Sequence, residues 1–126
     1  MKKILVIDDD EDIKKIITIK LKSAGYSVAT ATDGYAGLQV VKNDPPDLMI
    51  VDLMMPDMSG WEFSQTMKQS MKEGKQKRIP MIILSALISE DGPPDDLEAG
   101  DYYMKKPFDG NDLLKKVQEL LGEKKN

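Results

Sequence analysis

The chain of 126 residues contains no cysteine and no histidine. Without cysteine it can form neither disulfides nor thiolate metal sites, which is compatible with a cytoplasmic protein. Without histidine it has no imidazole that could bind a metal, act as a general base or carry a phosphoryl group. Any chemistry of the chain must therefore rely on carboxylates, hydroxyls, lysines and the backbone.

Long apolar runs and an excess of positive charge are also absent. Only about four apolar residues follow Met1-Lys2-Lys3 before the first acidic residues, far too few for a signal peptide or a membrane span. The formal net charge of −4 gives no reason to expect binding to nucleic acid or to an anionic membrane. We expect a cytoplasmic protein that binds neither, with one domain over residues 1–126 and no output domain.

Short apolar runs and helical patterns alternate along the chain. Five runs are typical of strands, at residues 4–7, 27–31, 48–51, 81–84 and 101–104. Four segments carry apolar residues at helical spacing, at residues 12–24, 33–43, 59–72 and 109–121. This alternation predicts a parallel sheet covered by helices on both faces.

Several polar residues stand where helices are expected to begin. Asp10, Asp33 and Asp109 are expected to be N-caps. Ser59 and Glu62 form an S-x-x-E capping box. The sequence therefore marks the start of each of these four helices.

The segment between the fourth and fifth strands breaks this rhythm, because it contains Gly92-Pro93-Pro94. A proline inside a helix costs about 3 kcal/mol and disfavours helical geometry at the residue before it. We predict a long loop and then a short helix that starts near the prolines, where proline suits the first turn.

Chemically active side chains follow the expected strands. Asp8 and Asp9 follow the first strand, Asp52 ends the third, and Ser85 and Lys106 follow the fourth and fifth. In open α/β sheets, ligands bind at this carboxyl edge. Carboxylates brought together there repel one another unless a cation holds them, and hard oxygen ligands suit Mg²⁺. An aspartate can also attack phosphorus to form an acyl phosphate.

These residues lie in four motifs that resemble the receiver domain of two-component response regulators. Ile4–Asp9 resembles the acidic pair of that family, and Pro46–Pro56 with Gly60 resembles its phosphoacceptor segment. Ile83–Ala86 resembles the hydroxyl motif and Lys106–Phe108 the lysine motif. Four motifs in the right order, each after an apolar strand, make the resemblance specific.

The resemblance implies a fold. It is an α/β fold of the flavodoxin-like, doubly wound type, with a five-stranded parallel sheet in the order 2-1-3-4-5 and five flanking helices. The first and third strands are then neighbours, as the carboxylates require. Here the fourth helix is expected to be short or irregular. Because the family uses its fourth helix, fifth strand and fifth helix for output, that face departs from the usual pattern.

The resemblance also implies roles for the acidic residues. Asp52 would be the phosphoacceptor. Asp8, Asp9, Asp52 and the backbone carbonyl of Met54 would bind Mg²⁺, with Asp8 acting directly or through water.

Further roles follow for residues beside the phosphoacceptor. Ser85 and Lys106 would contact the phosphoryl group, and Ser85 and Tyr103 would form the switch that reports it. The Lys106–Pro107 peptide bond would often be cis. Met54 and Leu87, which are apolar, would flank the phosphoryl group without orienting water, so we expect slow self-dephosphorylation.

The resemblance implies the expected partners, and the absence of histidine means that the chain cannot supply its own phosphohistidine. The phosphoryl group would come from a sensor histidine kinase, a phosphotransfer protein or a small phosphodonor, and a downstream protein of unknown identity would read the change. We expect a monomer or a weak dimer that depends on phosphorylation. The chain would not be an enzyme beyond catalysing its own phosphorylation and dephosphorylation.

Two alternatives remain open at this point. The first is a Mg²⁺-dependent phosphohydrolase of the haloacid-dehalogenase type, which Asp8-x-Asp10 partly fits. Asp12 stands where that motif has Thr or Val, and Asp52 would have no role. The second is a receiver-like interaction module that phosphate no longer controls.

Overall fold

A computed structural model of the chain describes residues 2–52, 60–85 and 102–122. The strands are β1 (Lys3–Ile7), β2 (Ser27–Ala31), β3 (Leu48–Asp52), β4 (Met81–Ser85) and β5 (Tyr102–Lys105). The helices are α1 (Glu11–Ser23), α2 (Gly34–Asn43), α3 (Gly60–Lys72) and α4 (Gly110–Leu120). The short helix expected between β4 and β5 falls on residues outside the described part of the chain. The helix labelled α4 is thus the last of the five expected ones.

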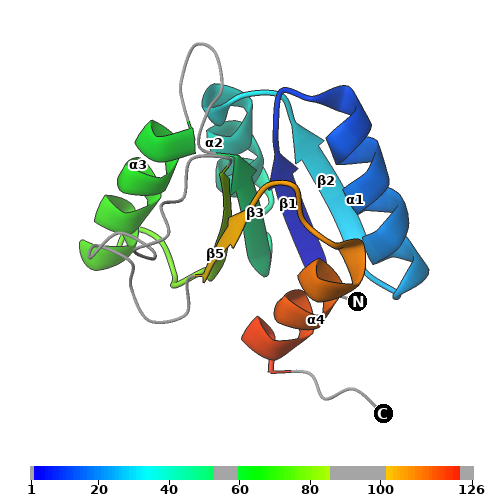
Figure 1. The fold of residues 1–126 in the computed structure, drawn as a ribbon. Helices are drawn as coiled ribbons and strands as arrows, with labels where there is room; N and C mark the ends of the chain where they lie inside the picture. Colours follow the sequence, from blue (N-terminus) through cyan, green and yellow to red (C-terminus); the bar gives the residue numbers. More distant parts are fainter. Residues whose placement is uncertain (1, 53–59, 86–101, 123–126) are drawn as a thin grey trace.

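The five strands form one parallel sheet in the order β2-β1-β3-β4-β5 (Figure 1). The expected strand order is confirmed. Ile7 at the end of β1 pairs with Val51 of β3, and Asp52 pairs with Leu84 of β4. Adjacent strands therefore end at nearly the same level, so the residues that follow them gather at one edge.

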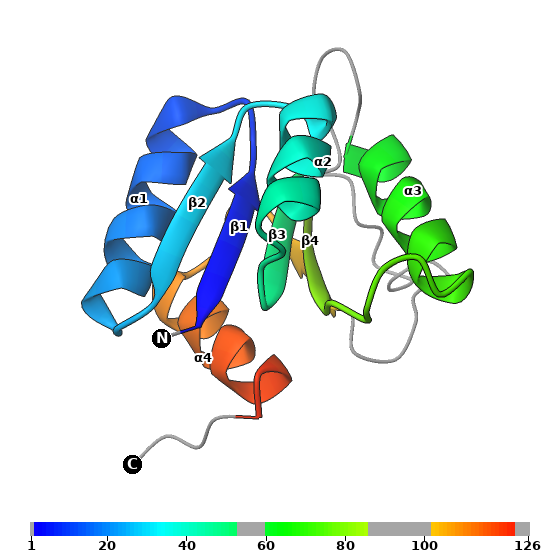
Figure 2. The same ribbon diagram turned by 180° about the vertical axis from the view of Figure 1, so that it is seen from behind.

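The helices cover both faces of the sheet, with α1 and α4 on one side and α2 and α3 on the other (Figures 1 and 2). Along β1, Ile4 and Val6 face the first pair of helices, and Leu5 and Ile7 face the second. Residues of opposite parity in a strand point to opposite faces, and both faces are covered. This is why the central strands are continuously apolar.

The predicted caps at described residues are confirmed. Asp10 Oδ1 accepts the N–H groups of Asp12 and Ile13, at 2.9 and 3.2 Å. Asp33 and Asp109 cap α2 and α4 in the same way. Ser59 of the expected capping box lies outside the described residues. No helix of the described chain has the length and apolar character needed to cross a bilayer.

Gly37 allows α2 to approach the sheet closely. A Cβ at this position would lie 2.4 Å from Ile7 Cδ1 and 3.2 Å from Phe63 Cε2, in the buried layer under α2 and α3. A gain in helix propensity of about 1 kcal/mol cannot offset the repacking of a dense core, which costs roughly 1–3 kcal/mol. We expect Gly37→Ala to lower the free energy of unfolding in urea titrations. Gly110→Ala is the control, because its Cβ would meet only Lys20, at 3.9 Å; equal stability of the two variants would contradict this packing.

Candidate functional site

Three carboxylates meet at the carboxyl edge of the sheet. Asp8 and Asp9 follow β1, and Asp52 is the last residue of β3. Because β1 and β3 are neighbours, one oxygen of each carboxylate lies within 4.8 Å of the other two. Asp8 and Asp52 are buried, whereas Asp9 is exposed. The fold therefore brings together three side chains that are up to 44 positions apart (52 − 8) in the sequence.

Asp8 is fully buried and is fixed through its own backbone and side chain. Its N–H donates to the carbonyl of Ala31 at the end of β2 (3.1 Å), and its Oδ1 accepts the N–H of Asp10 (2.9 Å). Burial raises the pKa of the Asp8 carboxyl. The Asp52 charge adds to this, while the Asp10 hydrogen bond and the Lys106 charge lower the pKa by less than the total rise. Ionised Asp8 thus needs more positive charge than its surroundings supply.

The ammonium group of Lys106 lies beside two of these carboxylates. Its Nζ lies 3.2 Å from an oxygen of Asp8 and 3.2 Å from an oxygen of Asp52. Burial lowers the pKa of Lys106 by the largest single amount, but the attraction of the two carboxylates outweighs it, so the pKa is raised. The backbone N–H of Lys106 donates to the carbonyl of Ser85 (2.9 Å), and the Lys106–Pro107 peptide bond is cis, as predicted.

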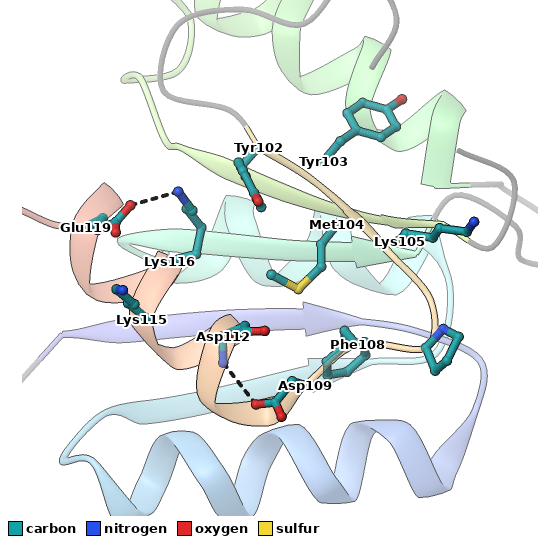
Figure 3. A pocket seen from close by; sticks show the side chains of 11 residues that line it. Tyr102, Tyr103, Met104, Lys105, Phe108, Asp109, Asp112, Lys115, Lys116 and Glu119 are labelled. Carbon is teal, nitrogen blue, oxygen red and sulfur yellow. Dashed lines mark hydrogen bonds and ion pairs between the residues drawn. The ribbon is translucent and has the colours of Figure 1, made fainter. Parts of the chain in front are cut away.

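Ser85 and Tyr103 lie on neighbouring strands near this edge. Ser85 is the buried last residue of β4 and pairs in register with Lys105, one residue before Lys106. Tyr103 is partly buried and packs on the side of the sheet covered by α2 and α3. Figure 3 shows its ring on the opposite side of β5 from Tyr102. The switch role expected of Ser85 and Tyr103 stays a prediction.

Two of the expected residues lie outside the described part of the chain. They are Met54, whose carbonyl is expected to bind Mg²⁺, and Leu87, which with Met54 is expected to slow self-dephosphorylation.

The donor set fits a divalent cation with oxygen ligands. Among the described residues, three carboxylates cluster here and the Lys106 ammonium pairs with two of them, so negative charge is in excess in this part of the site. Mg²⁺ is typically bound by one or two carboxylates and keeps several waters. Because Asp9 is exposed, a hydrated ion can reach the cluster without passing through the core.

Reasoning from the sequence missed an apolar groove beside this site. The groove, of about 400 Å³, lies between α1 and the segment after β5. It is lined by Ile13, Ile16, Lys106, Pro107, Phe108 and Gly110. Ile16 belongs to the apolar pattern of α1, yet its side chain is 60% exposed. The sequence pattern alone could not distinguish this position from a core position.

A second cavity, also of about 400 Å³, lies between β5 and α4, with Tyr102, Met104 and Phe108 among its lining residues (Figure 3). Lys116 Nζ lies 4.2 Å from the centre of the Tyr102 ring and 2.7 Å from Glu119 Oε2. This cavity is on the strand and helix that the resemblance assigns to output.

The strand order and the position of the acidic cluster define a flavodoxin-like, doubly wound protein with its site at the switch point of the sheet. The sequence model of the response regulator receiver domain matches residues 4–118. The chain belongs to the response regulator receiver domain family.

Curated relatives and solved structures agree with this assignment. The chain is 35% identical over 121 residues to the alkaline phosphatase synthesis transcriptional regulatory protein PhoP of Bacillus subtilis, covering 95% of this chain and 48% of PhoP. It is 36% identical over 120 residues to the probable transcriptional regulator ycf27 of Porphyridium aerugineum, covering 94% of this chain and 48% of that protein. The chain thus spans about half the length of the curated relatives it matches.

Among solved structures, the response regulator TrrA of Thermotoga maritima in complex with Mg²⁺-BeF is 31% identical, with a TM-score of 0.77. That alignment covers 95% of this chain and 99% of TrrA. The chemotaxis response regulator CheY4 of Vibrio cholerae is also 31% identical, with a TM-score of 0.80, covering 95% of this chain and 98% of CheY4.

The family assignment decides against the phosphohydrolase alternative. The matching family is that of response regulator receiver domains and not a classical enzyme family. In addition, the Asp10 carboxylate that the phosphohydrolase motif would require is used to cap α1.

Proposed function

We propose that the chain is a signalling switch that accepts a phosphoryl group on Asp52 and depends on Mg²⁺. The observation that carries the proposal is the convergence of Asp8, Asp9, Asp52 and Lys106 at the carboxyl edge of the sheet. Two-component signalling through a receiver domain is the activity of the family to which the chain belongs.

In the proposed reaction, a carboxylate oxygen of Asp52 attacks the phosphorus of the donor. An oxygen–phosphorus bond forms, and the bond from phosphorus to the donor's imidazole nitrogen, or to the acetate oxygen of acetyl phosphate, breaks with its electron pair. Phosphoryl transfer depends mainly on positioning and on neutralisation of charge. Asp52 is fixed as the last residue of a buried strand, which aims its carboxylate at the sheet edge.

The neighbouring residues of the chain would stabilise the transferred group. The Lys106 ammonium, 3.2 Å from Asp52 in this structure, would bind phosphoryl oxygens, and the Ser85 hydroxyl would donate a hydrogen bond to one of them. Asp8, Asp9 and Asp52, with the Met54 carbonyl, would hold Mg²⁺. When bound, Mg²⁺ supplies positive charge against the repulsion between carboxylates and phosphoryl oxygens.

The added charge would act by shifting a conformational equilibrium. A phosphoryl group adds roughly −1.5 to −2 charges at neutral pH. The Ser85 hydroxyl would move toward it, and the Tyr103 ring would turn inward, so that phosphorylation favours a state already present in the ensemble. The cavity between β5 and α4 is then a surface that a downstream protein would read.

The direct test is incubation of the purified protein with acetyl phosphate and Mg²⁺. We expect one acid-stable, base-labile phosphate, mapped to Asp52 by mass spectrometry. A folded protein that binds Mg²⁺ but acquires no phosphate would contradict the proposal and favour an interaction module that phosphate does not control.

The family implies a histidine kinase or phosphotransfer protein as donor, and we propose that this donor docks on the apolar groove of α1. The groove is continuous with the phosphoacceptor site, because Lys106 lines both. A donor helix seated there would bring a phosphohistidine close to Asp52.

We expect Ile16→Asp to lower the rate of phosphotransfer from a phosphorylated histidine kinase by about tenfold or more, because an apolar anchor is lost and a charge is buried. Phosphorylation by acetyl phosphate should be unchanged, because a small donor needs no groove. Ile19→Asp is the matched control: Ile19 is 58% exposed on the same helix but does not line the groove. Equal losses in both variants, or a loss with acetyl phosphate, would contradict docking at the groove.

A further inference from the structure

Lys14 is a buried cation on α1 that the proposed reaction does not use. Its side chain is only 7% exposed, whereas Lys15, the next residue of the helix, is exposed. Lysine is rarely buried unless partners satisfy its ammonium group. Lys14 Nζ donates to Glu11 Oε1 at 2.8 Å and to Thr32 Oγ1 at 3.0 Å.

The two partners of Lys14 belong to different parts of the fold. Glu11 is in the first turn of α1, and Thr32 directly follows the last residue of β2. Ala31, the residue before Thr32, accepts the N–H of Asp8 through its carbonyl, at 3.1 Å. Lys14 and Asp8 thus attach the start of α1 and the end of β1 to two consecutive residues at the end of β2.

The segment that these attachments enclose carries two of the three clustered carboxylates. Within it, the Asp10 N–H donates to Asp8 Oδ1, and Asp10 in turn caps α1. Asp9 lies between these two fixed residues and is itself exposed. The position of its carboxylate therefore depends on how firmly α1 is held against the end of β2.

We infer that Lys14 is a positioning residue for the Mg²⁺ site, because its bridge to Thr32 holds the Asp8–Asp10 loop in the geometry that binds the ion. The inference rests on the proposed function of the acidic cluster. Residues behind a metal site that orient its ligands affect affinity without touching the metal.

Charge alone predicts the opposite result for loss of Lys14. An ammonium near an acidic cluster repels a cation, so its removal should leave Mg²⁺ affinity unchanged or raise it. If Lys14 positions the loop, its removal should weaken Mg²⁺ binding although a positive charge has been lost. The sign of the change in affinity therefore separates the two explanations.

The test is the Mg²⁺ dissociation constant of the whole chain, measured by isothermal titration calorimetry without any phosphodonor. We expect Lys14→Met to weaken Mg²⁺ binding by about tenfold or more, the scale seen when groups behind metal ligands are lost. Lys14→Arg should restore most of the affinity, because a guanidinium can donate to both partners. Lys15→Met, which removes the same charge from the exposed side of the helix, should bind Mg²⁺ as tightly as the wild type or slightly more tightly.

Thr32→Val removes one end of the bridge with almost no change in volume. We expect it to weaken Mg²⁺ binding and to add nothing when combined with Lys14→Met, because both substitutions break the same contact. If Lys14→Met does not fold, Thr32→Val decides the question. Unfolding in urea with EDTA is measured in parallel, because a purely structural role would lower stability and leave Mg²⁺ affinity unchanged.

Mg²⁺ affinity in Lys14→Met or Thr32→Val that equals that of Lys15→Met would overturn the inference. A wild-type protein that binds no Mg²⁺ would instead contradict the proposed function of the cluster. The two failures are therefore distinguishable.

Discussion

Asp52→Asn is expected to abolish phosphorylation by acetyl phosphate and Mg²⁺. Asparagine has nearly the same shape, but its amide cannot attack phosphorus to form an acyl phosphate. The buried end of β3 should tolerate this change, because the substitution removes one of the carboxylates that repel each other in the cluster. The measurement is incorporation of base-labile phosphate, followed by intact mass and by electrophoresis in phosphate-binding gels.

Two controls make this prediction specific. Asp109→Asn changes an aspartate that caps α4, and because asparagine also caps helices, phosphorylation should be unaffected. Asp8→Asn should reduce the rate by weakening Mg²⁺ binding while leaving the phosphate on Asp52. Phosphate that persists on Asp52→Asn at wild-type stoichiometry, or that maps to Asp8, would assign the nucleophile to another residue.

The features of the fold and the site that could be predicted from the sequence depend on patterns among residues that are close together in the chain. An apolar run of four or five residues that ends in a carboxylate predicts a buried strand with a polar residue at its end. Asp8 and Asp52 are therefore expected at one edge of the sheet if their strands are neighbours. Asp33 and Asp109 were also predictable as caps, because capping involves only residues close in the sequence.

The parts that could not be predicted depend on distances between elements. Lys14 and Lys15 are adjacent and chemically identical, yet one is buried and the other exposed, because only Lys14 faces the end of β2. Ile16 fits the apolar pattern of α1, but it is exposed rather than packed in the core. The close approach at Gly37 likewise follows from where α2 lies over Ile7 and Phe63, which no local pattern encodes.

In the absence of Mg²⁺, Asp8→Asn is expected to make the protein more stable at neutral pH, although it removes a residue of the site. The folded-state pKa of Asp8 is raised above its ordinary value of 3.8, chiefly by burial. A carboxyl with a raised folded pKa contributes stability that is full below the unfolded-state pKa and is lost as the pH rises through the folded pKa. At neutral pH, ionised Asp8 therefore costs stability, and asparagine removes that cost.

Urea unfolding in EDTA at pH 7 should show Asp8→Asn more stable than the wild type. The difference should shrink as the pH falls through the raised folded-state pKa, and it should vanish below 3.8, where Asp8 becomes protonated in both the folded and the unfolded protein. Loss of the Asp8–Lys106 pair should not reverse the sign, because Lys106 Nζ also lies 3.2 Å from Asp52, which the substitution leaves in place.

Mg²⁺ should reverse the order of stability between the two proteins. Wild type gains about 2.7 kcal/mol at a Mg²⁺ concentration one hundred times its Kd, and Asp8→Asn gains far less because its site is weakened. Asp109→Asn, whose change lies outside the cluster, should follow the wild type with and without the ion.

If Asp8→Asn were less stable than wild type in EDTA at pH 7, burial of Asp8 would not be the destabilising effect that Mg²⁺ relieves. If the order failed to reverse with Mg²⁺, Asp8 would not belong to the ion's site. The excess negative charge at this edge of the sheet would then explain both effects: it would destabilise the free protein, and it would provide the affinity for the ion on which the proposed phosphorylation of Asp52 depends.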